Sequence, residues 1–241
     1  MAISGTYAFN PDVSELIEES YERAGLELRT GYDLRTARRS LNFLMLEWQN
    51  KGLNLWTIEE TSSPISLVKS TATYDIATGT IGLLDVVLRT DDGSTTLQSD
   101  YLLNLIAEPT YANIPNKLTE ARPLQYYFQR KEILDITDGV NQNSTITLWP
   151  IPDETGKYKV YYWRVKRISD VGDNAANTMQ VPGRFLPSLV AGLAYQIAAK
   201  RPEAAGRVSM LKQIYDETFK EAADEDRVKT SARFVPGLSY Y

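Results

Sequence analysis

Residues 34–48 read LRTARRSLNFLMLEW, and residues 185–197 read FLPSLVAGLAYQI. Both stretches repeat apolar side chains at the three- and four-residue spacing of a single helix face. These side chains are Leu34, Ala37, Leu41, Leu44, Met45 and Trp48 in the first stretch, and Phe185, Leu189, Leu193 and Ile197 in the second. An amphipathic helix must bury its apolar face against another element. Two such helices near opposite ends of the chain therefore predict a helical body assembled from both ends.

Flanking residues supply further helix signals. Asp12 and Glu15 have the spacing of a capping box at the start of a helix, and Gly25 is a plausible stop for it. Pro202 fits near the start of a last helix. The apolar stripe expected on that last helix consists of Val208, Leu211, Ile214, Tyr215, Phe219 and Ala222.

Between the helical ends, the pattern is typical of β-strands. Short strands are expected around residues 65–68 and 71–75, and a longer one over residues 82–89. Asp91-Asp92-Gly93 predicts a hairpin turn with a return strand at residues 95–98. Asp100 is expected to cap a short helix over residues 101–107, and residues 110–123 are expected to form a loop. Four strands at residues 124–130, 132–136, 144–149 and 158–168 then predict a β-meander.

The predicted fold class is α+β. A helical bundle is expected from residues 9–56 and 183–232, with a mostly antiparallel β domain inserted at residues 57–182. Residues 233–241 are expected to form an extended C-terminal tail.

Composition excludes several kinds of active site. The chain has 241 residues, no cysteine and no histidine. Disulfides, thiolate nucleophiles, His-dependent triads and Cys or His metal ligands are therefore impossible. The net charge is -5 and no block of like charges stands out, so no basic tail for DNA or acidic membranes is visible. We find no signal peptide and no apolar run of membrane-spanning length.

The carboxylates that remain do not predict a catalytic site. The sequence contains three acidic clusters that could be candidates: Glu18/Glu19, Asp91/Asp92 and Asp224/Glu225/Asp226. Adjacent residues on a helix point in different directions, and Asp91 and Asp92 fall in a turn. Solvated helix faces and turn chemistry explain the three clusters, so we expect no catalytic residue, cofactor or metal.

Residues 157–167 read KYKVYYWRVKR and combine aromatic and basic side chains. Aromatic stacking beside cations is a means of binding single-stranded nucleic acid or sugars. Strand alternation, however, divides these residues between two faces. Tyr158, Val160, Tyr162 and Val165 are expected on a core or interface, and the charged residues toward solvent or a negatively charged partner.

The last residues differ in kind from the rest. Arg233, Phe234, Val235, Pro236, Leu238, Tyr240 and Tyr241 follow a charged helix end without helical or strand periodicity. Such an apolar peptide is costly to leave in water, and extended peptides dock well into grooves. It is expected to dock either on its own domain or on a partner.

Three segments resemble the head-to-tail adaptor proteins of short-tailed bacteriophages, also called tail accessory factors or packaged-DNA stabilisation proteins. The first contains RRSLN at residues 38–42 and EWQNKGLNLW at residues 47–56. The second is TLWPIPD at residues 147–153, followed by the tyrosine-rich strand. The third begins with VPGRF at residues 181–185 and runs through the last helices into RFVPG at residues 233–237. Together they frame nearly the whole chain.

The resemblance implies a non-enzymatic structural protein of the virion neck or tail, assembled in the host cytoplasm. It implies a homo-oligomeric ring of twelve copies under the portal protein, which extends the channel for double-stranded DNA and takes part in genome ejection. The C-terminal segment, residues 233–241, would dock on the portal. The β domain, with Trp149, Tyr162 and Trp163, would face a tail nozzle or hub protein and possibly a tail fibre.

Two alternatives remain open at this point. The β domain could be a binding module for a host glycan or a fibre, which an exposed Trp149 or Trp163 would favour. A carboxylate-based hydrolase would need two acidic side chains facing one cleft.

Overall fold

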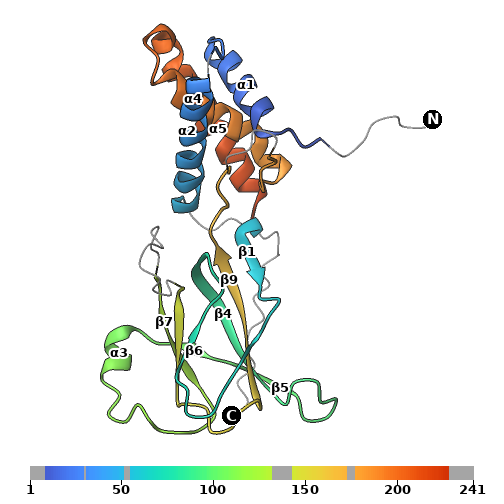
Figure 1. The fold of residues 1–241 in the computed structure, drawn as a ribbon, viewed down its shortest axis with the longest axis vertical. Helices are drawn as coiled ribbons and strands as arrows, with labels where there is room; N and C mark the ends of the chain where they lie inside the picture. The colour runs from blue at the N-terminus through green and yellow to red at the C-terminus, as the bar shows by residue number, and fades with distance from the viewer. Residues whose placement is uncertain (1–8, 30, 52–54, 132–142, 173–176, 228–241) are drawn as a thin grey trace, which may run out of the picture. The chain divides into compact units, whose positions relative to one another are not determined.

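The computed structural model describes residues 9–29, 31–51, 55–131, 143–172 and 177–227. The described chain divides into two compact units (Figure 1). The helical unit contains the described residues up to Trp56 and from Ile168 onward, and the β unit is Thr57–Arg167. Helices and sheets are both present, which confirms the predicted α+β class.

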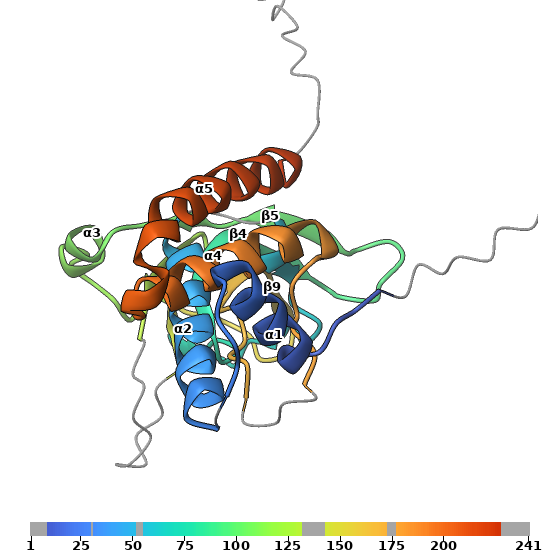
Figure 2. The same ribbon diagram turned by 90° about the horizontal axis from the view of Figure 1, so that it is seen from above.

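Four helices and three short 3-10 turns belong to, or adjoin, the helical unit. They are α1 (Val13–Ala24), α2 (Gly31–Asn50), η1 (Leu55–Thr57), η2 (Gly183–Phe185), α4 (Leu186–Ala198), η3 (Pro202–Arg207) and α5 (Val208–Glu225). Helix α4 packs against the other three helices, and Figure 2 shows it between α1 and α5. Both ends of the chain therefore share one apolar core.

The predicted capping box at the start of α1 is present. The Asp12 carboxylate accepts a hydrogen bond from the Glu15 N–H at 2.9 Å, and the Glu15 carboxylate accepts one from the Asp12 N–H at 3.1 Å. At the other end Gly25 has φ 73°, a left-handed conformation that glycine adopts without steric cost. Local sequence alone thus defines both ends of this helix.

Aromatic side chains fill the centre of the helical core. Trp48 lies 5.5 Å from both Phe185 and Phe219, measured between ring centroids. The Trp48 indole N–H donates to the Tyr215 hydroxyl at 2.9 Å, and that hydroxyl donates to Glu47 at 3.0 Å. The polar atoms that these large side chains bring into the core are therefore satisfied, and α2 is joined to α5.

The apolar stripe predicted for α5 includes one side chain that does not belong to this core. Leu211, Tyr215 and Ala222 of the predicted α5 stripe are buried, but Ile214 is exposed. Adjacent helical positions point about 100° apart, so Tyr215 and Ile214 cannot both face the same core.

The β unit contains nine strands and one short helix among its described residues. They are β1 (Ile58–Glu60), β2 (Ile65–Ser66), β3 (Thr73–Asp75), β4 (Thr80–Thr90), β5 (Ser99–Leu102), β6 (Asn104–Leu105), α3 (Glu108–Ala112), β7 (Gln125–Gln129), β8 (Thr145–Trp149) and β9 (Tyr158–Lys166). One sheet has the order β1-β9-β4-β5, with β2 also paired to β9, and the other has the order β3-β8-β7-β6. All pairs are antiparallel except β6 with β7.

The predicted meander is wrong at its last step. Strand β8 pairs with β7 and β3, whereas β9 pairs with β1, β2 and β4 in the other sheet. Ile146 and Leu148 of β8 nevertheless share one core with Val160 and Tyr162 of β9. Strand alternation predicts which face is buried but not which strand is the neighbour. The strand predicted at residues 132–136 lies outside the described residues.

The segment after the hairpin also differs from the prediction. Residues 99–105 form β5 and β6 instead of a helix, and the return strand begins at Ser99 rather than residue 95. The Asp100 carboxylate does not cap a helix because it pairs with Arg89 across the hairpin, at 2.8 and 2.9 Å. The helix forms instead at α3, which begins before the predicted loop and overlaps its first residues, and Pro109 lies in its first turn, where proline is tolerated.

We predict that Gly192→Ala will lower the free energy of unfolding by about 1–3 kcal/mol, the usual cost of overpacking a core. A Cβ at this position would lie 2.9 Å from the Tyr215 ring and 3.0 Å from Leu44, both buried. Urea unfolding followed by circular dichroism measures the change. Gly206→Ala is the matched control, because its Cβ would meet no atom within 4 Å. An unchanged midpoint for Gly192→Ala would contradict the tight packing of α4.

Candidate functional site

The acidic clusters considered from the sequence have different surroundings in the described chain. Within the described ranges there is no group of three or more ligand residues that could hold a metal ion. Asp92 lies against β9, where Lys159 donates to it at 2.7 Å. Glu19 pairs with Arg23 along α1 at 2.7 Å.

Asp226 has a structural role at the end of α5. It is only 6% exposed, accepts a hydrogen bond from the Leu55 N–H at 2.8 Å, and pairs with Arg184. One carboxylate thereby links three segments of the helical unit. Its neighbour Asp224 is exposed and pairs with the exposed Arg227 at 2.8 Å.

The basic and aromatic residues of β9 divide between two faces, as alternation predicts. Tyr158, Val160 and Tyr162 are buried, and the residues between them lie on the outer face. Val165, expected with the buried residues, is only half-buried and falls on the other face, because it is an odd number of positions from Tyr162.

Of the three cations in this strand, Lys159 lies on the outer face, whereas Arg164 and Lys166 continue the side of Tyr162. All three already have carboxylate partners. Lys159 pairs with Asp92 at 2.7 Å, and Arg164 and Lys166 pair with Glu59 at 2.8 and 2.9 Å. Three cations neutralised in this way are poor ligands for nucleic-acid phosphates.

Hydrogen bonding to these cations changes the acidity of Glu59. Its pKa lies below the ordinary value, first because Lys166 donates a hydrogen bond to it and then because Arg164 does. The charged form of Glu59 is therefore part of the folded β unit.

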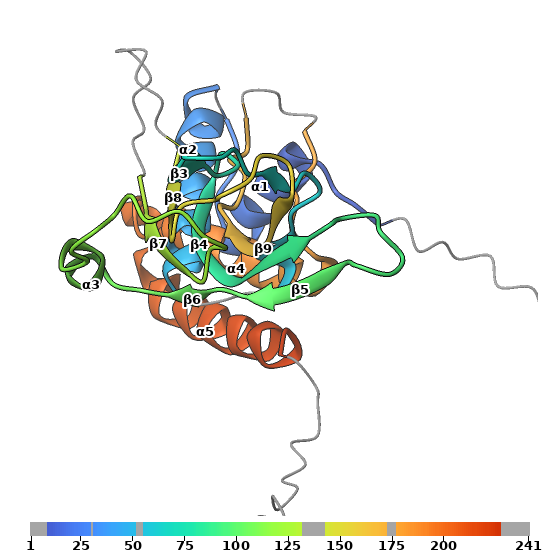
Figure 3. The ribbon, with the colours of Figure 1, turned by 90° about the horizontal axis from the view of Figure 1, so that it is seen from below.

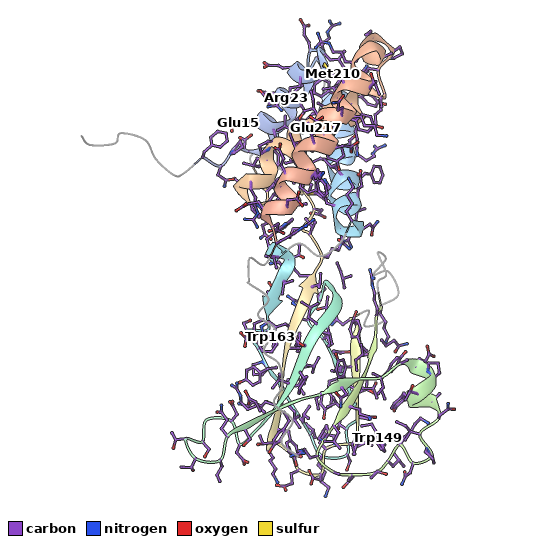
Figure 4. All side chains as sticks on the ribbon, turned by 180° about the vertical axis from the view of Figure 1, so that it is seen from behind. Glu15, Arg23, Trp149, Trp163, Met210 and Glu217 are labelled. Atoms are coloured by element: carbon purple, nitrogen blue, oxygen red, sulfur yellow. The ribbon has the colours of Figure 1, made fainter. Side chains whose placement is uncertain are left out.

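The three β-domain residues expected at an interface have different surroundings. Tyr162 is 2% exposed, and its hydroxyl accepts a hydrogen bond from the Ala77 N–H at 3.3 Å, so it belongs to the core. Trp149 and Trp163 are half-buried and lie in different sheets (Figure 4). The Trp149 indole N–H donates to the Asn116 carbonyl at 3.1 Å. The two tryptophans therefore do not form one platform.

An aromatic pair that could not be predicted from the sequence lies on the sheet that contains Trp149. Tyr111 of α3 stacks on Tyr127 of β7, with centroids 5.7 Å apart and rings inclined by 14°. The Lys117 ammonium lies 5.5 Å from the centroid of the Tyr111 ring. Tyr127 shares a face of β7–β8 with Trp149, because Gln125 is the register partner of Trp149 and alternate residues share a face.

A second exposed feature is the edge formed by consecutive strands β5 and β6, which we call the β5–β6 edge (Figure 3). These strands are the last members of the two sheets. Leu102 is 64% exposed and Leu105 is 62% exposed. Leu124, which is also exposed, lies beside them, because its carbonyl accepts from the Asn104 N–H at 3.1 Å. Unpaired strand edges with apolar side chains are sites for association.

The tail residues Arg233, Phe234, Val235, Pro236, Leu238, Tyr240 and Tyr241 lie outside the described residues. None of the described helices combines the length and apolar character that crossing a membrane requires.

One comparison identifies relatives of this chain. The family model described as SU10 adaptor protein matches residues 11–236. The match contains the first two segments of the resemblance to head-to-tail adaptors and all but Gly237 of the third. No curated protein matches the chain.

The ion pairs of Glu59 predict a pH-dependent contribution to stability. A carboxylate with a depressed folded-state pKa stabilises the protein above its ordinary pKa, and that stabilisation is lost as the pH falls through the folded value. Glu59→Gln should therefore destabilise the protein most at pH 7, and the difference from wild type should close below about pH 4. Urea unfolding across this range measures it. Glu60→Gln, at an exposed position of the same strand, should change little at any pH.

The buried carboxylate of α5 supplies a second prediction. Asp226→Ala removes a charged hydrogen-bond acceptor from the Leu55 N–H and from Arg184, so it should cost about 1.5–3 kcal/mol of unfolding free energy. Asp224→Ala breaks only an exposed ion pair and should cost about 0–1 kcal/mol. Equal unfolding midpoints for the two variants would show that Asp226 does not link the segments.

Proposed function

The chain belongs to the SU10 adaptor protein family, and from that premise we propose that it is the head-to-tail adaptor subunit of a phage virion. In this proposal twelve copies form a ring under the portal protein. The ring extends the channel for double-stranded DNA and seats the tail nozzle or hub.

The C-terminal tail is proposed as the portal-docking element. It follows α5, the last described helix, and the family match continues to Pro236, past Arg233, Phe234 and Val235. An apolar-aromatic peptide of this kind makes many contacts with few residues when it enters a groove. The described end of α5 is bound to the rest of the helical unit, since the Asp226 carboxylate accepts from the Leu55 N–H and the Trp48 indole donates to Tyr215.

The β5–β6 edge is proposed as the seat for the tail-side protein. Its leucines are exposed, and an edge strand offers free backbone hydrogen-bonding groups to a partner. The aromatic pair Tyr111–Tyr127 and the half-buried Trp149 lie in the sheet that β6 ends, and they add contact area of the kind enriched at interfaces.

Passage of DNA is compatible with the charge of the chain. A net charge of -5, repeated around a ring, repels phosphates and reduces adhesion to the channel. The pairing of Lys159, Arg164 and Lys166 with carboxylates lowers phosphate affinity in the same direction. We propose no enzymatic activity, because the carboxylate clusters considered above have turn, helix-surface or structural roles.

The portal-docking proposal predicts that truncation will abolish attachment. By native mass spectrometry, the full chain should add one copy per subunit of the virion's portal ring, and a chain ending at Ala232 should add none. Circular dichroism should show the same helical content for both chains. If both bind equally the tail has no docking role, and if neither binds the adaptor proposal is wrong.

The β5–β6 edge supplies a separate prediction. A double variant with Leu102→Asp and Leu105→Asp should keep portal binding but lose at least tenfold in affinity for the nozzle or hub protein, because charges would enter an apolar contact. Leu97→Asp is the control, since Leu97 is 66% exposed but lies in the turn before β5. Unchanged tail-protein affinity in the double variant would remove this edge from the interface.

A further inference from the structure

A groove of about 840 Å³ opens between α1 and the first turn of α4, and we call it the α1–α4 groove. Its apolar lining comes from Phe9, Pro11, Leu16, Leu186, Pro187 and Val190. Its rim is acidic, with Glu15, Glu18, Glu19 and Glu22 against the single cation Arg23. Figure 4 labels Glu15 and Arg23 of α1.

The rim carries more negative charge than the helix itself neutralises. Glu19 is paired with Arg23, and Glu15 closes the capping box. Glu18 and Glu22 are exposed and have no ion-pair partner among the described residues. They lie four positions apart, where like charges on a helix repel each other. A cation from outside would relieve this repulsion.

Helix α2 carries exposed apolar side chains together with basic ones, the opposite charge to the rim of the α1–α4 groove. Tyr32, Arg35, Arg39, Phe43 and Leu46 are all exposed and recur every three or four residues, so they form one line, which we call the outer stripe of α2. Tyr32 is 66% exposed and Phe43 is 58% exposed. The other face of α2 is buried in the helical core, so this stripe points outward.

The outer stripe has an excess of positive charge. Arg35 and Arg39 also lie four positions apart, and within the described ranges neither has an ion-pair partner. The pKa of the nearby Lys200 lies below its ordinary value, mainly through burial and further through the charge of Arg39. An anion from outside would be favourable here.

We infer that the outer stripe of α2 in one copy occupies the α1–α4 groove of the next copy in the ring. Arg35 and Arg39 then face Glu18 and Glu22, while Phe43 and Leu46 cover the apolar lining. This inference rests on the proposed adaptor function and identifies its subunit interface.

Geometry favours a second copy as the occupant. Tyr32 to Leu46 spans about 21 Å of helix and α1 about 18 Å, so the two surfaces have similar lengths. Both charged pairs are spaced by four residues, about 6 Å along a helix axis, so two ion pairs can form together. In Figure 2, α2 lies on the left of the helical unit, and the first turns of α1 and α4 lie on its right. Two different surfaces on one unit make a heterologous contact, the kind that closes into rings.

Charge reversal tests the inference in the full-length chain. One variant carries Arg35→Glu and Arg39→Glu, and the other carries Glu18→Lys and Glu22→Lys. Each alone should reduce association between copies at least tenfold, measured by native mass spectrometry with and without the portal ring. Their equimolar mixture should restore association, because alternating copies present opposite charges at every contact. A control with Glu217→Lys and Glu221→Lys makes the same charge change on the outer face of α5 and should assemble normally.

Cross-linking provides a second readout that does not depend on stability. The natural chain has no cysteine, so a chain with Glu22→Cys and Arg39→Cys has only these two thiols. Oxidation of assembled rings should give a ladder of linked copies that reduction removes. Either single variant should stay monomeric on the gel, because identical positions do not meet in a heterologous contact.

The possible outcomes separate this inference from the adaptor proposal. If the wild-type chain attaches to the portal but the reversed variants still associate normally and no ladder forms, the interface is wrong and the adaptor function stands. If the groove variant loses portal attachment and keeps contacts between copies, the groove belongs to the portal. If a ladder forms only after truncation at Ala232, the groove holds the chain's own tail. A wild-type chain that binds neither portal nor itself overturns both proposals.

Discussion

Helix α4 is buried on nearly every side, and the helical unit depends on covering it. Ser188, Leu189, Val190, Ala191, Gly192, Leu193 and Ala194 are consecutive buried residues, so no face of this stretch is left for solvent. Helices α1 and α2 from the beginning of the chain and α5 from its end supply the cover. Gly192 allows α5 to pack closely on α4, because the Tyr215 ring of α5 occupies the space that a side chain at position 192 would need. The two ends of the chain therefore stabilise each other, and the intervening residues 57–167 can form a unit with its own core.

The two units treat their charges differently. In the β unit, Glu59 of β1 and Asp92 of the turn after β4 neutralise the cations of β9 through ion pairs within the unit. In the helical unit, α1 and α2 keep like charges four residues apart without ion-pair partners among the described residues. Uncompensated charge of opposite sign on two faces of one body costs little in water but gives strong complementarity when the faces meet. This difference is why we assign contacts between copies to the helical unit.

Sequence reasoning succeeded where the signal is local. The capping box of Asp12 and Glu15, the stop at Gly25 and the stripe from Phe185 to Ile197 are contained in short windows, and the structure reproduces each of them. It failed where partners are distant in sequence. Asp100 has the local chemistry of a helix cap, but Arg89 binds its carboxylate. The same limit applies to function: Trp149 could be named from sequence, whereas the stacking of Tyr111 on Tyr127 depends on how α3 folds back on β7.

The β5–β6 edge is the feature of the β unit that most favours the proposed assembly. Residues 99–105 read SDYLLNL and contain neither the lysine nor the proline that protects natural sheet edges. The only charge there, Asp100, is already paired with Arg89. Leu103 points into the core while the side chains of Leu102 and Leu105 remain mostly exposed, so these two side chains gain little from burial in the single chain. An apolar edge of this kind favours aggregation unless a partner covers it. Its presence is therefore better explained by an assembly in which the edge is buried than by the stability of the subunit.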